Sequence, residues 1–146
     1  MKNLSEGILF EENGALLKWG KSLDTLGKTN HAKKEDKNGR TYYYWGTHSI
    51  LNGLNLDLVS DYLHDKPWYF PRKFHSIQHI VIGDIEAKKS FSELAKHLTE
   101  HFGEPQKEEN VEQDDILLLW QIDSVTIQLY FFEMHCYRVH LTIKKK

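Results

Sequence analysis

The chain has 146 residues, of which 40% are hydrophobic, 27% charged and 12% aromatic. These values are typical of a globular domain with its own core, and they exclude a disordered, collagen-like or membrane-spanning chain. The 19 Lys and Arg residues against 21 Asp and Glu residues give a net charge of −2, which argues against a general nucleic-acid binder. With a single cysteine, the chain forms no internal disulfide and no cysteine-rich zinc site.

The N-terminal segment carries polar side chains where a secretory signal would need a continuous apolar run. The longest apolar run, 116–120, has five residues, whereas a membrane-spanning helix needs about 20. We therefore expect a cytosolic protein, and we expect neither a membrane nor a nucleic acid as its partner.

Two Asn-Gly pairs in the first half of the chain, Asn13-Gly14 and Asn52-Gly53, each separate two apolar runs. Such a pair predicts a β-hairpin closed by a type I′ turn, because both central residues of that turn need a positive φ. The runs that we expect to be strands are 8–10, 15–17, 41–51 and 54–58.

The other segments of the first half are a helix, two loops and a strand. A short helix is predicted to begin at Ser22, which is a favourable N-cap residue. The polar stretch 29–40 has Ala32 as its one apolar residue and predicts a loop. The proline-containing stretch 61–73 predicts a second loop, and 77–82 predicts a strand.

The clearest helix signal runs from Ser90 to Phe102. Apolar residues recur there at helical spacing, and Ser90 with Glu93 three residues later predicts a capping box at the helix start. Gly103 predicts the helix end. An acidic loop is expected at 104–115, followed by strands at 116–122, 125–132 and 137–143.

The two halves of the chain show the same order of signals: a helix, a hairpin and a further strand. Trp45 and Trp120 hold equivalent places in this order. We predict one α+β domain over 1–146, with repeat halves 1–83 and 84–146. Because hairpin connections favour antiparallel pairing, we expect a mainly antiparallel sheet of about six to eight strands, with about two helices on one face.

Charge is distributed unevenly along the chain. Residues 18–40 have a net charge of +4, and residues 84–115 have a net charge of −6. A solvated acidic loop is the simpler interpretation of the second region, and docking onto a basic partner is the functional one. The carboxylates of 104–115, which Lys107 alone opposes, are Glu104, Glu108, Glu109, Glu112, Asp114 and Asp115.

Trp68 and Tyr69 lie between two prolines in the predicted loop 61–73. They are either an aromatic plug beneath that loop or anchors of a protein interface, where Trp and Tyr often dominate the binding energy.

Nine histidines raise the question of a metal or catalytic site. His97 and His101 lie four residues apart, a spacing that can chelate a metal, but we interpret them as partly exposed helix residues. Because the sequence has no nucleophile-elbow, dinucleotide-binding or P-loop motif, we predict no enzyme, no catalytic residue, no metal and no cofactor. The alternative is a small enzyme or ligand-binding domain with a site on the sheet. Two or more of five histidines would converge there: His48, His75, His79, His135 and His140.

The motif Phe102-Gly103-Glu104-Pro105, after a helix that starts at Ser90, resembles the repeat of β-lactamase-inhibitor-type modules. This resemblance implies that the helix leads into an antiparallel sheet over 90–143. The whole chain resembles small bacterial toxin-immunity proteins in its size, α+β make-up and acidic segment. That second resemblance implies a protein-binding inhibitor.

The sequence therefore predicts a cytosolic binding protein of immunity type that neutralises a basic protein partner, such as a toxin nuclease, by steric and electrostatic occlusion. Its predicted partner-binding residues are the six carboxylates of 104–115 together with Trp68 and Tyr69. A structural domain that forms a homodimer through its aromatic surface is a further alternative.

Overall fold

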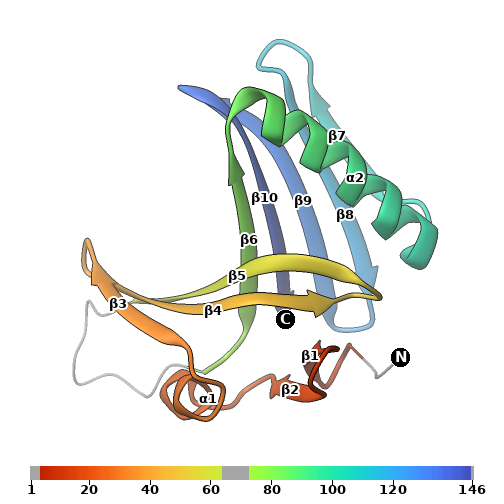
Figure 1. The fold of residues 1–146 in the computed structure, drawn as a ribbon. Coiled ribbons are helices and arrows are strands. Elements are labelled where there is room, and N and C mark those ends of the chain that lie inside the picture. Colours follow the sequence, from red (N-terminus) through yellow and green to blue (C-terminus); the bar gives the residue numbers. More distant parts are fainter. Residues whose placement is uncertain (1–3, 64–72, 146) are drawn as a thin grey trace. The chain divides into compact units, whose positions relative to one another are not determined.

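The computed structural model describes residues 4–63 and 73–145. Within these residues the chain forms two helices, an eight-stranded antiparallel sheet and a separate two-stranded sheet (Figure 1). The order of strands in the large sheet is β3-β4-β5-β6-β10-β9-β8-β7. The α+β fold class and the antiparallel sheet that the sequence predicts are confirmed.

The elements, in chain order, are β1 (Gly7–Phe10), β2 (Ala15–Lys18), α1 (Leu23–Thr29), β3 (Lys33–Lys37), β4 (Arg40–Ile50), β5 (Leu54–Leu63), β6 (Ser76–Ile82), α2 (Asp84–Phe102), β7 (Gln106–Asn110), β8 (Asp115–Ile122), β9 (Val125–Met134) and β10 (Cys136–Lys145).

The order of elements repeats along the chain. Helix α1 precedes β3 to β6, and helix α2 precedes β7 to β10. The last strands of the two sets, β6 and β10, are neighbours in the sheet, so β3 and β7 are its two edge strands. Trp45 on β4 and Trp120 on β8 are both buried. This element order follows the repeat inferred from the sequence, while the domain boundaries proposed there stay a prediction.

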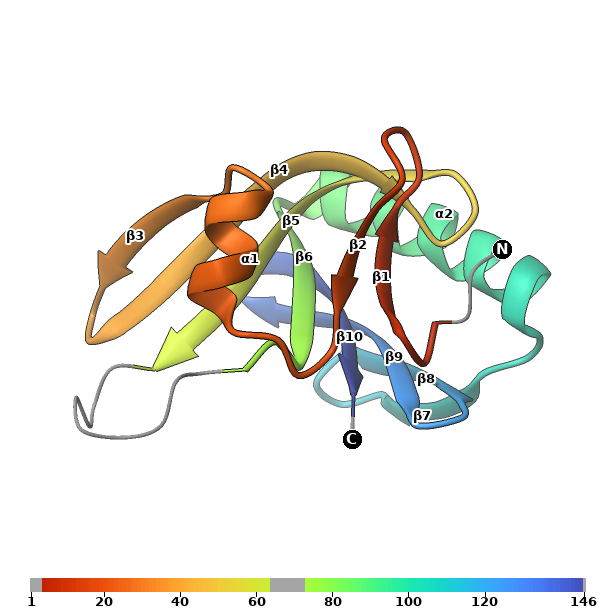
Figure 2. The same cartoon turned by 90° about the horizontal axis from the view of Figure 1, so that it is seen from below.

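The chain divides into two compact units, Met1–Ile77 with Lys145, and Gln78–Lys144. In the first unit, α1 and the β1–β2 hairpin both contact β4 (Figure 2). The hydroxyl of Tyr43 on β4 donates a hydrogen bond to the carboxylate of Asp24 on α1. The most deeply buried apolar side chains here are Ile8, Phe10, Leu17, Ile50, Phe74 and Ile77.

In the second unit, α2 lies across β8 and β9 (Figure 1). The ring of Phe91 on α2 lies 5.3 Å from the ring of Phe131 on β9. Side chains of a strand alternate between its two faces, so the alternate residues of β9 on the Phe131 side are the ones directed toward α2. The large apolar side chains that are almost fully buried in this unit include Leu98, Val125, Ile127, Leu129, Leu141 and Ile143.

The predicted start of α2 is wrong. The helix begins at Asp84, six residues before Ser90, and Ser90 lies within it instead of capping it. The first turns hold one buried apolar residue, Ala87, whereas Ile85 is 79% exposed, so they carry little apolar periodicity. Asp84 and Glu86 favour the helix start through the helix dipole.

The predicted loop 29–40 is also wrong. Residues Lys33–Lys37 form β3, which pairs antiparallel with β4 along its full length. Because β3 consists only of Lys, Glu and Asp, its sequence has neither the apolar alternation nor the β-branched and aromatic residues that indicate a strand. Because β3 is an edge strand, its charged side chains protect the edge against pairing with another chain.

Both hairpins marked by Asn-Gly are confirmed, but their turns are longer than type I′ turns. Phe10 pairs with Ala15, which leaves a loop of four residues. Ile50 pairs with Leu54, which leaves a loop of three residues, 51–53.

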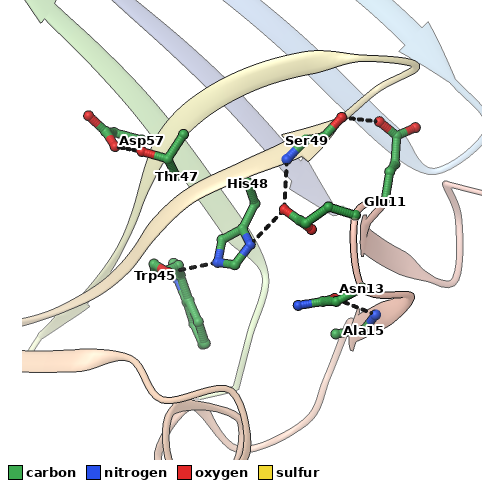
Figure 3. A network of polar contacts seen from close by, with 9 residues as sticks. Glu11, Asn13, Ala15, Trp45, Thr47, His48, Ser49 and Asp57 are labelled. Carbon is green, nitrogen blue, oxygen red and sulfur yellow. Dashed lines mark hydrogen bonds and ion pairs between the residues drawn. The ribbon is translucent and has the colours of Figure 1, made fainter.

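The β4–β5 turn holds a carboxylate from the N-terminal hairpin. Its residues Leu51, Asn52 and Gly53 have φ values of 50°, 66° and 101°, a conformation in which successive N–H groups form an anion-binding concavity. The Glu11 carboxylate accepts hydrogen bonds from the amides of Asn52 and Gly53, both at 2.9 Å. It also accepts one from Ser49 Oγ at 2.8 Å (Figure 3). Glu11 therefore ties the first hairpin to this strained turn.

Substituting Glu11→Gln is expected to lower the free energy of unfolding at pH 7 by about 1 kcal/mol, because a charged acceptor is lost at a solvent-accessible site. Partial burial raises the pKa of Glu11, but the hydrogen bonds from Gly53, Ser49 and Asn52 outweigh it and hold the pKa below its ordinary value of 4.5. The stabilisation is therefore complete above pH 4.5 and is lost as the pH falls through the lowered pKa.

Denaturant unfolding at pH 7 and pH 3 measures this effect, with Glu6→Gln on the exposed chain before β1 as the control. The difference between wild type and Glu11→Gln should shrink at pH 3. A difference of the same size at both pH values would contradict this role for the Glu11 charge.

Candidate functional site

The acidic segment 104–115 is mainly a β-hairpin and not the predicted loop. Strand β7 covers Gln106–Asn110 and pairs with β8 from Leu119 to Asp115, leaving 111–114 as the turn. All five side chains of β7 are exposed. This part of the sequence has no strand signal because all five residues are polar. The strand is held by its pairing with β8. We call residues 104–115 the acidic hairpin.

Strand pairing aligns part of the acidic hairpin with an aromatic surface. Glu108 on β7 lies opposite Leu117 on β8, and Leu117 lies opposite Tyr130 on β9. Asp115 is two residues from Leu117 and shares its face. Tyr130 neighbours Phe131, which contacts α2, so these four residues lie on the sheet face opposite α2.

We call this surface the open face, and it also includes two aromatic rings next to Tyr130. The rings of Tyr130 and Phe132 stack with centroids 4.6 Å apart, and His140 on β10 meets Phe132 edge-on at 5.0 Å. All three side chains are only partly buried. The open face thus combines exposed carboxylates with accessible aromatic rings.

Two adjoining hollows lie at the acidic end of the open face. The first, of about 370 Å³, includes Glu108 and Leu117 in its lining. The second, of about 530 Å³, includes Glu112 from the turn. Asp115 and Tyr130 line both hollows, so the two lie next to each other.

Apolar side chains extend the open face onto β6. The amide of Gly83 donates a hydrogen bond to the carbonyl of Tyr137 at 3.0 Å. Antiparallel pairing from this point places Ile80 opposite His140, and Ile82, two residues nearer the strand end, opposite Arg138. Ile80 is 39% exposed and Ile82 is 56% exposed. The surface therefore has an acidic end and an apolar end.

Tyrosine hydroxyls at the acidic end bond to carboxylates. Tyr137 donates to Asp114 Oδ2 at 2.5 Å, and Tyr130 donates to Asp115 Oδ2 at 3.1 Å. The Asp114 hydrogen bond, with burial and the charges of nearby carboxylates, raises the pKa of Tyr137 to about 12. Burial and the Asp115 hydrogen bond raise the pKa of Tyr130. Both shifts reflect the concentrated negative charge of this surface.

At the other end of the aromatic surface, burial lowers the pKa of His140, and the positive charge of Arg138 lowers it further. His140 is therefore held neutral near pH 7, where it packs as an aromatic ring.

Replacing Asp114→Asn is expected to lower the pKa of Tyr137 toward 10, because the carboxylate that stabilises its protonated form becomes a neutral amide. An NMR pH titration of the tyrosine ring carbons measures this shift. The control Glu112→Gln removes a charge from the same turn and should shift the Tyr137 pKa less. Equal shifts in the two variants would contradict the specific hydrogen bond.

The six predicted carboxylates are not equivalent in the structure. Glu108, Asp115, Glu112 and Asp114 line the two hollows. Glu109 lines the first hollow and also forms an ion pair with Lys107 at 3.4 Å. Glu104 is exposed before β7 and lines neither hollow. The two predicted aromatic anchors, Trp68 and Tyr69, lie outside the described residues.

Sequence reasoning missed the aromatic and acidic residues that β9 and β10 contribute. Strand β9 has apolar side chains on both faces, so from the sequence alone its open-face residues were expected to belong to the core. One signal could have identified the accessible face of β9: the polar residue Gln128 lies on the same side of the strand as Tyr130 and Phe132. Glu133 and Tyr137 also line the second hollow, although the ring of Tyr137 stacks on Phe131 with centroids 5.1 Å apart and so lies on the α2 side of the sheet.

The histidines of the alternative hypothesis have different surroundings. His48 contacts Glu12, His75 contacts the Lys73 carbonyl, and His140 contacts Phe132. His97 and His101 face each other on α2 with ring centroids 4.3 Å apart. Among the described residues, no group of three or more His, Cys, Asp or Glu side chains is arranged to hold a metal ion.

Comparison of the chain with family models, curated proteins and solved structures gave no match. In the described part of the chain, neither helix has the length and apolar character needed to span a membrane. The functional interpretation rests on the geometry and charge of the acidic hairpin and the open face.

Proposed function

We propose that this chain is a protein-binding inhibitor of immunity type, which neutralises a basic protein partner by covering its functional surface. The observation that carries the proposal is the pair of neighbouring hollows that Tyr130 and Asp115 both line, with Glu108 in the lining of the first and Asp114 in that of the second. Carboxylates bind Lys and Arg side chains, and aromatic faces add cation–π contacts with the same cations.

The architecture suits a docking surface. Three of the six carboxylates, Glu108, Glu109 and Asp115, lie on paired strands, so their backbone positions are fixed before binding, which lowers the entropy cost of association. A concentration of negative charge speeds the encounter with a positive partner. The exposed Ile80 and Ile82 add apolar area at the other end of the same face, and apolar area is typical of the core of a protein interface.

A basic partner is the kind of protein that acts on nucleic acid. Such proteins expose Lys and Arg because they must neutralise phosphates. An acidic protein that covers those side chains competes with the nucleic acid for them. The proposed mechanism is therefore occlusion of a toxin nuclease, and it needs neither a catalytic residue nor a cofactor from this chain. We place the encounter in the cytoplasm.

Co-expression of the tagged chain with the proteins encoded beside its gene tests this function. A basic neighbour should copurify in stoichiometric amount and remain bound at moderate salt. The same experiment with Glu108→Gln/Glu112→Gln should recover less partner. The matched control is Glu93→Gln/Glu100→Gln, which removes two exposed charges from α2 and should recover the wild-type amount. A neighbour that copurifies equally with both double variants would contradict docking through the acidic hairpin.

A further inference from the structure

Two histidines lie one turn apart near the C-terminal end of α2. His97 and His101 are four residues apart, so their side chains leave the same side of the helix. His97 is partly exposed and His101 is exposed. Their ring centroids are 4.3 Å apart, with the planes tilted by 43°. The helix therefore holds two imidazole rings side by side at a surface that a solvated ion can reach.

The separation of the two rings is close to that of two ligands on one metal ion. Zinc lies about 2.0–2.1 Å from the nitrogen of a histidine ligand, almost always in tetrahedral geometry, so two imidazoles on one ion have centroids roughly 5 Å apart. The rings of His97 and His101 lie within about 1 Å of that separation. A change in side-chain torsions is enough to bring one nitrogen of each ring onto a shared ion.

The chemistry of the pair selects the kind of ion. Imidazole suits zinc, copper and nickel, whereas magnesium and calcium take oxygen ligands. A metal-bound imidazole uses one ring nitrogen and donates a hydrogen bond from the other, so a polar contact at the second nitrogen is compatible with binding. Among residues 4–63 and 73–145, no group of three or more His, Cys, Asp or Glu side chains is placed to hold an ion, so water completes the coordination of an ion bound to this pair.

We propose that His97 and His101 form a surface site for one divalent transition-metal ion of the zinc, copper and nickel group. The site has two protein ligands and open positions, so it exchanges its ion more readily than a structural zinc site with four protein ligands. Copper should bind more tightly than nickel or zinc, as it does to most nitrogen ligands.

The charges along the helix do not oppose a cation at this site. Glu93 lies one turn before His97, and Glu100 is the neighbour of His101. Lys96 is the one basic residue between them, so residues 93–101 have a net charge of −1 with neutral histidines. Both carboxylates are exposed and raise the concentration of cations near the pair.

An ion at this site would hold the C-terminal end of α2. The amide of Gly103, the C-cap residue, donates to the carbonyl of Thr99 at 2.9 Å. An ion that binds the folded helix and joins its last turns stabilises this end against fraying. Because α2 lies on the sheet face opposite the open face, the ion leaves the proposed docking surface accessible. The two proposals can therefore fail separately.

Titration calorimetry of the untagged protein with zinc chloride tests the site. We expect one ion to bind per chain. His97→Gln and His101→Gln should each weaken binding by about tenfold or more, because each removes the second arm of the chelate. The matched control His75→Gln/His79→Gln removes two histidines with the same spacing in the sequence. Those residues lie in and just before β6, about 13 Å apart in an extended chain, so this variant should bind zinc as wild type does.

A second variant separates the spacing of the histidines from their number. Lys96→His/His97→Gln keeps two histidines on α2 but places them five residues apart, where they no longer neighbour each other on the helix. It should bind zinc as weakly as His97→Gln does. In wild type, zinc should slow hydrogen exchange of the Gly103 amide, and it should not do so in either single variant. Zinc affinity that is unchanged in His97→Gln, or retained in Lys96→His/His97→Gln, would overturn the proposal.

Discussion

Neutralising two carboxylates of the acidic hairpin, in Glu108→Gln/Glu112→Gln, is expected to slow association with the basic partner about tenfold at low salt. Glu108 lines the first hollow of the open face and Glu112 the second, and neither forms an ion pair with another residue of 4–63 or 73–145. Their charge therefore acts on an approaching partner over about one Debye length, which is roughly 30 Å at 0.01 M ionic strength. Stopped-flow association rates at low and high salt measure the effect.

The salt dependence distinguishes steering from a loss of fold. At high salt the rates of wild type and variant should converge, because screening removes the long-range attraction. The control Glu93→Gln/Glu100→Gln carries the same change in net charge on the exposed side of α2 and should associate close to the wild-type rate. If both double variants slow association equally, net charge and not the acidic hairpin governs the encounter.

Replacing Trp120→Ala is expected to lower the free energy of unfolding by about 3 to 5 kcal/mol, the usual cost of truncating a buried aromatic residue. Trp120 is 3% exposed and lies on β8. Its indole N–H donates to the Gly103 carbonyl at the C-cap of α2, at 2.8 Å. The side chain thus fills the core and fixes the end of the helix.

Trp120→Phe separates the two contributions, because it keeps an aromatic ring and removes the indole hydrogen bond. It should cost about 1 to 3 kcal/mol through the unpaired Gly103 carbonyl. The matched variant Trp45→Phe should cost less, because its acceptor is the hydroxyl of Ser60, which also bonds to the Ser76 carbonyl. Denaturant unfolding measures both variants, and a larger loss for Trp45→Phe would contradict this assignment.

The sequence predicted those elements whose signal is local. The alternation in β10 and the apolar runs of β8 and β9 identified strands to within a few residues of their ends, because these strands bury side chains of their own. The two edge strands, β3 and β7, were missed. Both consist of exposed polar residues and hold their conformation through pairing with β4 and β8. Pairing is non-local, and no periodicity within five polar residues reveals it.

The candidate site was predictable in its charge and not in its geometry. Composition identified the carboxylates of 104–115, but it did not show that Glu108 and Asp115 share a face with Tyr130. That arrangement depends on the register between three strands. The contacts of Glu11 and His48 could not be predicted from the sequence either. Glu11 and Glu12 lie at least 36 residues along the chain from their partners on β4 and in the β4–β5 turn.

Titration of the purified basic partner with this chain tests the central claim most directly. If the proposed partner is the toxin nuclease that we infer, its activity should fall in proportion to the added wild-type chain and vanish at one equivalent, because occlusion requires one bound inhibitor for each active surface. Glu108→Gln/Glu112→Gln should need an excess over the partner, while Glu93→Gln/Glu100→Gln should match wild type. Full partner activity in the presence of a saturating amount of the bound wild-type chain would contradict inhibition by occlusion.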